Sequence, residues 1–132
     1  MEVNVIFLGT SAGIPTNSRG LPAIAIRRKG ELFLLDCGEG TQRQMLTARI
    51  GFCRRTKIFI SHMHGDHLFG LPGLLQTMAL LGRSRPLEIY GPKGIGDFVK
   101  TSIGVARPSN SYAVDVHEVD AGLVDGDGDL DP

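Results

Sequence analysis

The chain has 132 residues, of which 42% are hydrophobic and 21% charged, a composition typical of one globular domain with a real core. No stretch approaches the roughly 20 consecutive apolar residues of a membrane span, and residues 1–4 lack the basic start and apolar centre of a signal peptide. We therefore expect a cytoplasmic protein that does not enter a membrane.

The formal net charge of zero hides a division along the chain. Residues 1–112 carry all 14 Lys and Arg and seven acidic residues, for +7, whereas residues 113–132 carry the other seven acidic residues and no Lys or Arg, for −7. A basic body suits a phosphate-rich partner, although, from the charge pattern alone, solvated basic turns are the commoner explanation of such clusters. The clusters lie at residues 27–29, 54–55 and 83–85.

The end of the chain differs from the rest in composition. Residues 120–132 are acidic and of low complexity, so we expect a mobile tail after a domain that covers residues 1–119. Asp125, Asp127 and Asp129 imitate the start of a calcium loop. Leu130 stands where that loop needs glycine, so the spacing does not favour calcium.

Taken in chain order, the first elements predict antiparallel β structure. Residues 3–8 form a short apolar run that predicts a buried strand, and Gly, Pro and Ser in residues 9–22 predict a long loop. Two further strands are expected at residues 23–26 and 32–35, with Lys29-Gly30 as a hairpin turn between them.

The rest of the chain alternates helices with strands. Helices are expected at residues 39–49, 66–82 and 94–104, and strands at residues 56–61, 86–90 and 112–119. In the second helix the leucines recur on one apolar face, and Pro72 either sits in its first turn or interrupts it. This order of elements predicts an α/β layered domain.

The densest group of chemically active side chains follows the strand at residues 56–61. His62, His64, Asp66 and His67 fall within six residues, and the chain has only four histidines. Neutral imidazole and carboxylate are ligands that zinc-like ions prefer. A loop that leaves a strand can turn several side chains toward one point, so we expect His62 and His64 to hold one ion and Asp66 and His67 to face a second. The pattern predicts a two-metal hydrolase.

Other reactive residues fit simpler interpretations. Ser11 lies in a G-x-S-x-G pattern, but the Pro and Gly that follow do not open the helix that a nucleophile elbow needs, which favours a glycine loop beside the metal site. His117 alternates with apolar neighbours and shares a polar face with Asp115, which favours an exposed histidine over a third ligand. Cys37 and Cys53 form no C-x-x-C pair, so both are expected to be reduced and mostly packed.

Four segments, in order along the chain, carry a family resemblance. They are residues 7–16 with Arg19, residues 34–44, residues 61–73 and residues 87–94. Together they resemble the ribonuclease Z family, endonucleases of the metallo-β-lactamase superfamily that trim the 3′ trailer from precursor tRNA. The resemblance implies an α/β fold, the N-terminal half of a metallo-β-lactamase-like αβ/βα layered sandwich.

The same resemblance implies functional roles. It implies two Zn²⁺ ions per complete active site, precursor tRNA as substrate, a homodimer in the full-length family form, and His62, His64, Asp66 and His67 as metal ligands. Asp66 would also be the catalytic proton acceptor. Asp36 is placed near the metal loop, where it either accepts the spare N–H of a liganding histidine or caps the following helix.

Family members are longer than this chain, and their remaining metal ligands lie beyond its last residue. We therefore expect the 132-residue chain to be inactive alone. Two alternatives stay open. The chain is either a non-catalytic or split-protein fragment that binds metal or RNA weakly, or part of another metallo-β-lactamase-fold hydrolase.

Overall fold

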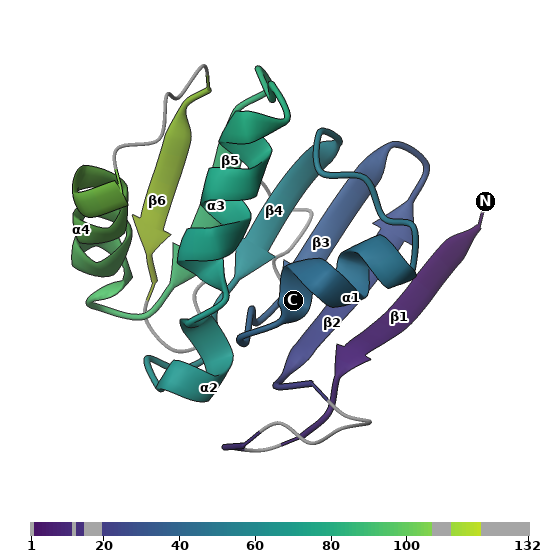
Figure 1. Ribbon diagram of the computed structural model, residues 1–132, viewed down its shortest axis with the longest axis horizontal. Helices are drawn as coiled ribbons and strands as arrows, with labels where there is room; N and C mark the ends of the chain where they lie inside the picture. The colour runs from purple at the N-terminus through teal and green to yellow at the C-terminus, as the bar shows by residue number, and fades with distance from the viewer. Residues whose placement is uncertain (1, 12, 15–19, 107–111, 120–132) are drawn as a thin grey trace.

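The structure, a computed structural model, describes residues 2–11, 13–14, 20–106 and 112–119 (Figure 1). They form one six-stranded sheet in the order β1-β2-β3-β4-β5-β6, so each strand after β1 pairs with its predecessor in the sequence. The first two pairings are antiparallel and the last three are parallel. The strands are β1 (Val3–Gly9), β2 (Ala23–Arg28), β3 (Glu31–Leu35), β4 (Arg55–Phe59), β5 (Leu87–Gly91) and β6 (Val114–Glu118). The helices are α1 (Thr41–Thr47), α2 (Gly65–Leu68), α3 (Leu71–Leu80) and α4 (Ile95–Ala106).

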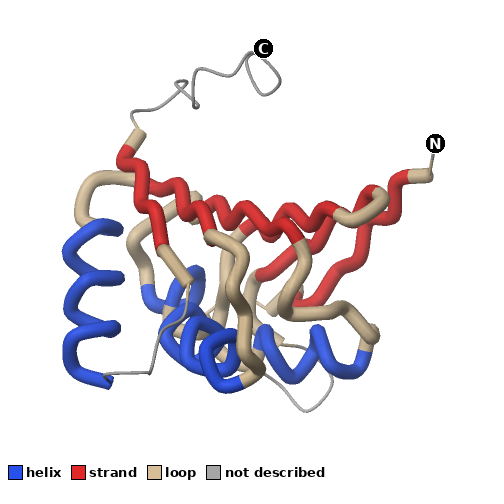
Figure 2. The backbone as a smooth tube through the Cα atoms, turned by 90° about the horizontal axis from the view of Figure 1, so that it is seen from above, coloured by secondary structure: helices blue, strands red, loops and turns tan. Residues whose placement is uncertain are grey.

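The helices lie on one face of the sheet (Figure 2). A row of side chains that runs across four paired strands points into this layer and is fully buried, at 0% exposure: Ala25, Leu34, Ile58 and Ile89. The same core includes buried residues of the helices, among them Met45 of α1 and Leu74 and Met78 of α3. Burial of this apolar row and the helix faces above it supplies the main driving force for the fold.

Among the residues that the structure describes, no helix lies on the opposite face of the sheet (Figure 2). Its apolar part spans β1 to β4, where strand register brings Phe7, Ile24, Leu35 and Phe59 into one row. One helical layer on one sheet, with an apolar second face, is the expected half of an αβ/βα sandwich. The predicted α/β class is therefore confirmed.

The first strand is less buried than its sequence predicts. Val3, Val5 and Phe7 are 53%, 55% and 66% exposed. The prediction of a buried strand was wrong because β1 is a sheet edge and these three residues point to the face without helices.

The predicted helix at residues 66–82 is two helices, α2 and α3, and they are separated at Phe69 and Gly70. A Cβ atom on Gly70 would lie 2.0 Å from the carbonyl oxygen of Gly38, so the chain here passes directly against the segment after β3. Pro72 then lies in the first turn of α3. The other predicted elements are present, with ends that differ by no more than two residues.

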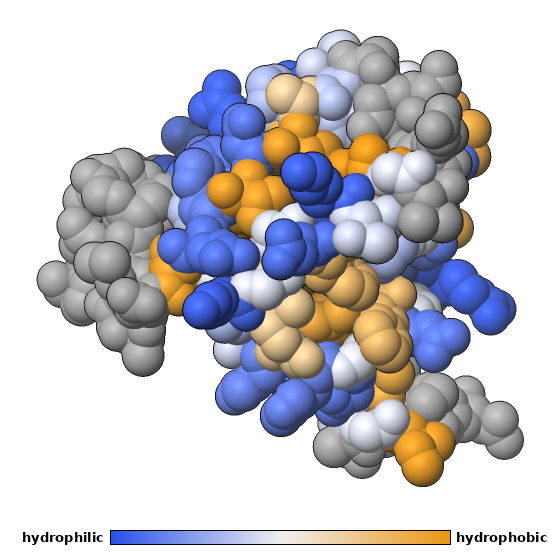
Figure 3. Space-filling view, turned by 90° about the vertical axis from the view of Figure 1, so that its left-hand side faces the viewer, coloured by the Kyte–Doolittle hydropathy of each residue, from blue (hydrophilic) through white to orange (hydrophobic). Residues whose placement is uncertain are grey.

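At the side of the molecule that carries α4 and β6, apolar side chains lie among polar ones (Figure 3). Phe69, which follows α2, stacks on Phe98 of α4 with ring centroids 6.2 Å apart.

No helix in the described part of the chain is long and apolar enough to cross a membrane. The predicted acidic tail at residues 120–132, with its calcium-like aspartates, lies outside the described residues, so the division into a domain at residues 1–119 and this tail stays a prediction.

Candidate metal centre

The candidate centre lies where β3 and β4 end. Because the two strands are parallel and adjacent, their carboxyl ends meet at one edge of the sheet, which is where open α/β sheets bind ligands. Asp36 follows β3, and the segment that runs from Ser61 to His67 follows β4. The N–H of Asp36 donates to the carbonyl oxygen of Phe59 at 2.7 Å, which continues the pairing of the strands by one residue.

The three imidazoles of this segment lie side by side. The ring centroids of His62 and His67 are 5.1 Å apart, those of His62 and His64 are 5.8 Å apart, and those of His64 and His67 are 6.4 Å apart. Nε2 of His67 lies 3.6 Å from Oδ2 of Asp66. The predicted ligands are therefore neighbours, and their nitrogen and oxygen donors suit a divalent ion.

Among the residues described, no group of three or more His, Cys, Asp or Glu side chains is arranged around one point as it would be around a bound ion. Ligation by His62, His64, Asp66 and His67 therefore stays a prediction.

Asp36 contacts the histidine cluster directly. Its Oδ2 lies 2.9 Å from Nδ1 of His67, and its Oδ1 accepts a hydrogen bond from the N–H of Ser61 at 2.7 Å. The backbone of Asp36 is left-handed, with φ 64°, a conformation that few residues other than Gly, Asn and Asp adopt. Helix α1 instead begins after Gly40, which makes no side-chain cap, so the helix-capping hypothesis for Asp36 was wrong.

The loop after β1 reaches the same site. The N–H of Gly13 lies 3.2 Å from Oδ2 of Asp66. Ser11 is buried, its hydroxyl donates to the carbonyl oxygen of Ile14, and the next described element is β2 rather than a helix. Gly13 therefore lies beside the candidate site, and residues 13–14, the described ones that follow Ser11, are bends and not the helix of a nucleophile elbow.

The backbone of Cys37 joins the segment after β3 to the metal loop. Its N–H donates to the carbonyl oxygen of His67 at 2.7 Å, and its carbonyl accepts from the N–H of Gly70 at 2.9 Å. Burial raises the pKa of the Cys37 thiol to about 12, so the thiol is neutral near pH 7. Both cysteines are free, as expected, but Cys53 is exposed, so the expectation that both are packed was wrong for Cys53.

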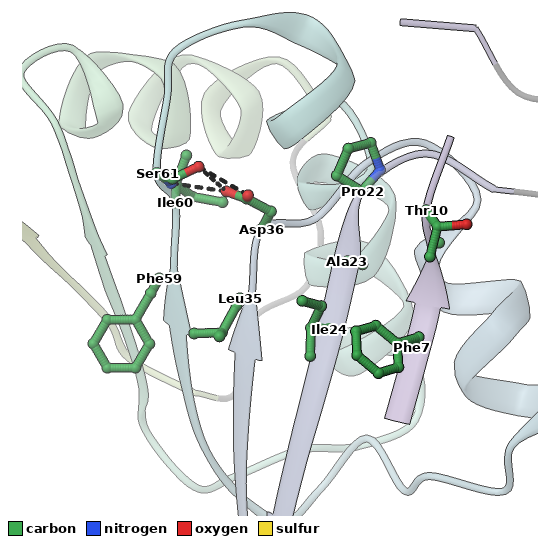
Figure 4. A pocket seen from close by; sticks show the side chains of 11 residues that line it. Phe7, Thr10, Pro22, Ala23, Ile24, Leu35, Asp36, Phe59, Ile60 and Ser61 are labelled. Carbon is green, nitrogen blue, oxygen red and sulfur yellow. Dashed lines mark hydrogen bonds between the residues drawn. The ribbon is translucent and has the colours of Figure 1, made fainter. Parts of the chain in front are cut away.

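A hollow of about 480 Å³ leads from the face without helices to this site (Figure 4). Its apolar wall includes Phe7, Ile24, Leu35 and Phe59, and its polar end is formed by Asp36 and Ser61. The hollow therefore reaches the candidate site at Asp36 and Ser61, and none of the four predicted ligands lines it.

His117 lies outside this cluster. Its ring stacks on Tyr90 with centroids 4.7 Å apart, and its Nε2 lies 3.9 Å from Oε1 of Glu88. The side chain is 45% exposed, which confirms the expected exposed histidine.

The basic clusters do not converge on the candidate centre. Arg28 and Arg55 approach Glu31 at 3.9 and 4.0 Å, at the amino ends of β3 and β4, whereas Asp36 and Ser61 follow the carboxyl ends. Binding of a phosphate-rich partner by these clusters stays a prediction.

Arg83, which sequence patterning assigned to a basic cluster, is buried and 1% exposed. Its guanidinium donates to four carbonyl oxygens, those of Phe52, Arg54, Arg85 and Pro86. It therefore joins the segment before β4 to the segment before β5, a structural role that the sequence did not reveal.

This sheet, with helices on one face and an H-x-H-x-D-H segment after β4, defines the metallo-β-lactamase fold. The metallo-β-lactamase fold protein YhfI from Bacillus subtilis shares it, with a TM-score of 0.68 at 22% identity over 94% of this chain and 49% of that one. The chain belongs to the family described as Anti-Pycsar protein Apyc1, whose model matches residues 3–102. Human tRNase Z, short form, is also similar, with a TM-score of 0.80 at 46% identity over 86% of this chain and 44% of that one.

Curated relatives carry ribonuclease names, which confirms the resemblance to ribonuclease Z. Ribonuclease BN of Cronobacter sakazakii is 48% identical over 131 residues, which are 97% of this chain and 43% of that protein. Ribonuclease Z of Methanothermobacter thermautotrophicus is 47% identical over 122 residues, which are 92% of this chain and 40% of that protein. The chain thus spans less than half the length of the curated relatives it matches.

Proposed function

We propose that this chain contributes part of the active site of a zinc-dependent endoribonuclease that removes the 3′ trailer from precursor tRNA. The observation that carries the proposal is the cluster of His62, His64, Asp66 and His67, with His67 oriented by Asp36, in a chain 46% identical to human tRNase Z, short form. A phosphodiesterase of this kind needs nitrogen and carboxylate donors grouped at one site, and a hollow ends at Asp36, which contacts His67.

In this proposal His62 and His64 hold one zinc ion, and Asp66 and His67 face a second. When bound, the two ions would lower the pKa of a water molecule and neutralise the charge that builds on the phosphate oxygens. Asp66 accepts the proton of the attacking water, and the N–H of Gly13 holds its carboxylate in place. Asp36 accepts a hydrogen bond from Nδ1–H of His67, which leaves the lone pair of Nε2 free to bind a metal.

Four side chains are too few for two catalytic ions, because a catalytic zinc takes about three protein ligands and a water. We propose that the other ligands come from a segment that corresponds to the rest of the relatives' length. A non-catalytic fragment that binds metal weakly is the second candidate, and the same ligand count favours it for the 132 residues on their own.

A trailer-cleavage assay on a precursor tRNA tests the proposal. The 132-residue chain alone should show no zinc-dependent cleavage, and addition of the remaining segment of ribonuclease BN of Cronobacter sakazakii should restore it. In the restored enzyme, Asp66→Ala should reduce the rate about 10³-fold or more because it removes a ligand and the proton acceptor together.

Two matched variants serve as controls. His117→Ala, on the far strand β6, and Ser11→Ala should both retain nearly full activity. Turnover by the 132-residue chain alone would contradict the ligand count, and loss of activity in Ser11→Ala would restore the serine-nucleophile hypothesis.

A further inference from the structure

Ser61 occupies the junction between the candidate ligands and Asp36. Its hydroxyl oxygen lies 2.9 and 2.8 Å from the two carboxylate oxygens of Asp36 and 2.9 Å from Nδ1 of His62 (Figure 4 shows the contacts with Asp36). Asp36 in turn lies 2.9 Å from Nδ1 of His67. One carboxylate therefore reaches two of the four candidate ligands, His67 directly and His62 through a hydroxyl.

The number of available protons fixes the direction of every hydrogen bond in this group. A carboxylate only accepts hydrogen bonds, and a serine hydroxyl has one proton to donate. Since Ser61 donates that proton to Asp36, its oxygen can only accept from His62, so Nδ1 of His62 must carry a proton. By the same reasoning Nδ1 of His67 carries a proton, which it donates to Asp36.

We infer that Ser61 and Asp36 are positioning residues that hold His62 and His67 in the Nδ1–H tautomer, with Nε2 of both rings left as a lone-pair donor. A neutral imidazole with one protonated nitrogen can bind a metal only through the other. The role toward a metal rests on the proposed function, whereas the tautomers are properties of the chain itself. Sequence patterning gave no role to Ser61.

The inference predicts different results for substitutions at the two positions. Ser61→Ala removes the acceptor for Nδ1–H of His62 and leaves the bond between His67 and Asp36 intact, so the tautomer of His62 alone should change. In Asp36→Asn, the backbone N–H of Ser61 can only donate a hydrogen bond, so the amide oxygen should face it. The amide NH₂ should then face His67. His67 should then become the Nε2–H tautomer and lose its donor.

The first measurement is nitrogen-15 NMR of the imidazole rings of the metal-free 132-residue chain at about pH 8. We expect Nδ1–H for His62 and His67 in the unsubstituted chain, a changed tautomer ratio for His62 in Ser61→Ala, and restoration in Ser61→Thr, which keeps a hydroxyl. Ser102→Ala, whose hydroxyl donates to the carbonyl of Phe98 in α4, is the control and should change neither ring. An Nε2–H tautomer at His62 in the unsubstituted chain, or no change in Ser61→Ala, would overturn the inference.

The second measurement is the affinity for zinc, by competition with a chromogenic chelator. Loss of a hydrogen-bond partner of a metal-binding histidine weakens binding about 10- to 100-fold, and we expect this for Ser61→Ala but not for Ser61→Thr or Ser102→Ala. Nδ1–H tautomers in a chain that binds no zinc would support the tautomer assignment and refute the proposed metal site. Failure of the tautomer assignment and failure of the proposed metal site therefore give different results.

Discussion

Burial keeps the thiol of Cys37 protonated over a pH range in which an exposed thiol ionises. Its pKa rises to about 12 from an ordinary value of 9.0. Between those values the unfolded chain loses the proton and the folded chain retains it, so the free energy of unfolding should fall as pH rises from about 9 toward 12. Below pH 9 the contribution of Cys37 to stability should be constant.

Denaturant titrations at several alkaline pH values check this prediction. Above pH 9, the free energy of unfolding should fall with pH in both chains, but the slope should be steeper by about 1 kcal/mol per pH unit in the unsubstituted chain than in Cys37→Ala. Cys53→Ala, at the exposed cysteine, is the matched control and should keep the steeper dependence. Equal slopes in the Cys37→Ala and unsubstituted chains would contradict it.

Side-chain roles that depend on local spacing could be predicted from the sequence, but contacts between distant segments could not. The grouping of His62, His64, Asp66 and His67 follows from six consecutive residues. The contact of Asp36 with His67 could be stated only as one of two alternatives, because it depends on the pairing of β3 with β4. The role of Arg83 was missed because its carbonyl partners include Phe52 and Arg54, about 30 residues away.

At the scale of elements, the close approach of the α2–α3 junction to the segment after β3 positions the metal loop. A Cβ atom on Gly70 would lie 2.0 Å from the carbonyl oxygen of Gly38, and one on Gly38 would lie 2.6 Å from the carbonyl oxygen of Asp66. Both close contacts are with backbone, which cannot rotate away. Gly38 and Gly70 thus allow two chain segments to touch at the candidate site.

We predict that Gly70→Ala lowers the free energy of unfolding by at least about 2 kcal/mol because the backbone must shift to admit a methyl group. Gly30→Ala, in the hairpin between β2 and β3, is the matched control, since a Cβ there meets no atom within 4 Å. Thermal unfolding of both variants gives the comparison. A Gly70→Ala variant as stable as Gly30→Ala would mean that the two segments can separate without loss.

The break between α2 and α3 and the exposure of β1 were not predicted from the sequence for the same reason. Leucine periodicity through residues 66–82 favours one helix, and Pro72 offered an interruption only as one of two alternatives. The contact of Gly70 with Gly38 shows where the chain must leave the first helix. Similarly, the apolar run of β1 predicts burial, but burial depends on whether another layer covers the strand. The hydrophobic pattern of a segment predicts its type of secondary structure better than it predicts which segments pack against it.

At the scale of the whole molecule, the described residues leave the apolar face of the sheet without a covering layer. Large exposed apolar patches mark surfaces that associate with other layers or other molecules. The 132-residue chain on its own should therefore self-associate and bind hydrophobic dyes through the face that includes Val3, Val5 and Phe7.

Sedimentation of the isolated chain tests this expectation. Phe7→Ser should weaken self-association by about 1–2 kcal/mol, roughly tenfold in the dissociation constant, because it removes exposed aromatic area. Leu46→Ser, at a side chain of α1 that is 63% exposed on the helical side, is the control and should leave association unchanged. Equal effects of the two variants would show that association does not depend on the open face of the sheet.

The strand order of the sheet also affects how the protein is made. In the described part of the chain, each strand from β2 to β6 pairs with the strand synthesised immediately before it, so only β1 must wait for a partner encoded later. Pairings between segments close in sequence lose less loop-closure entropy and form faster than distant ones. Chains emerge from the ribosome slowly compared with hairpin formation, so β1, β2 and β3 can assemble first and each later strand can add to an edge that already exists. The nascent sheet can thus grow by one strand at a time, in the direction of translation.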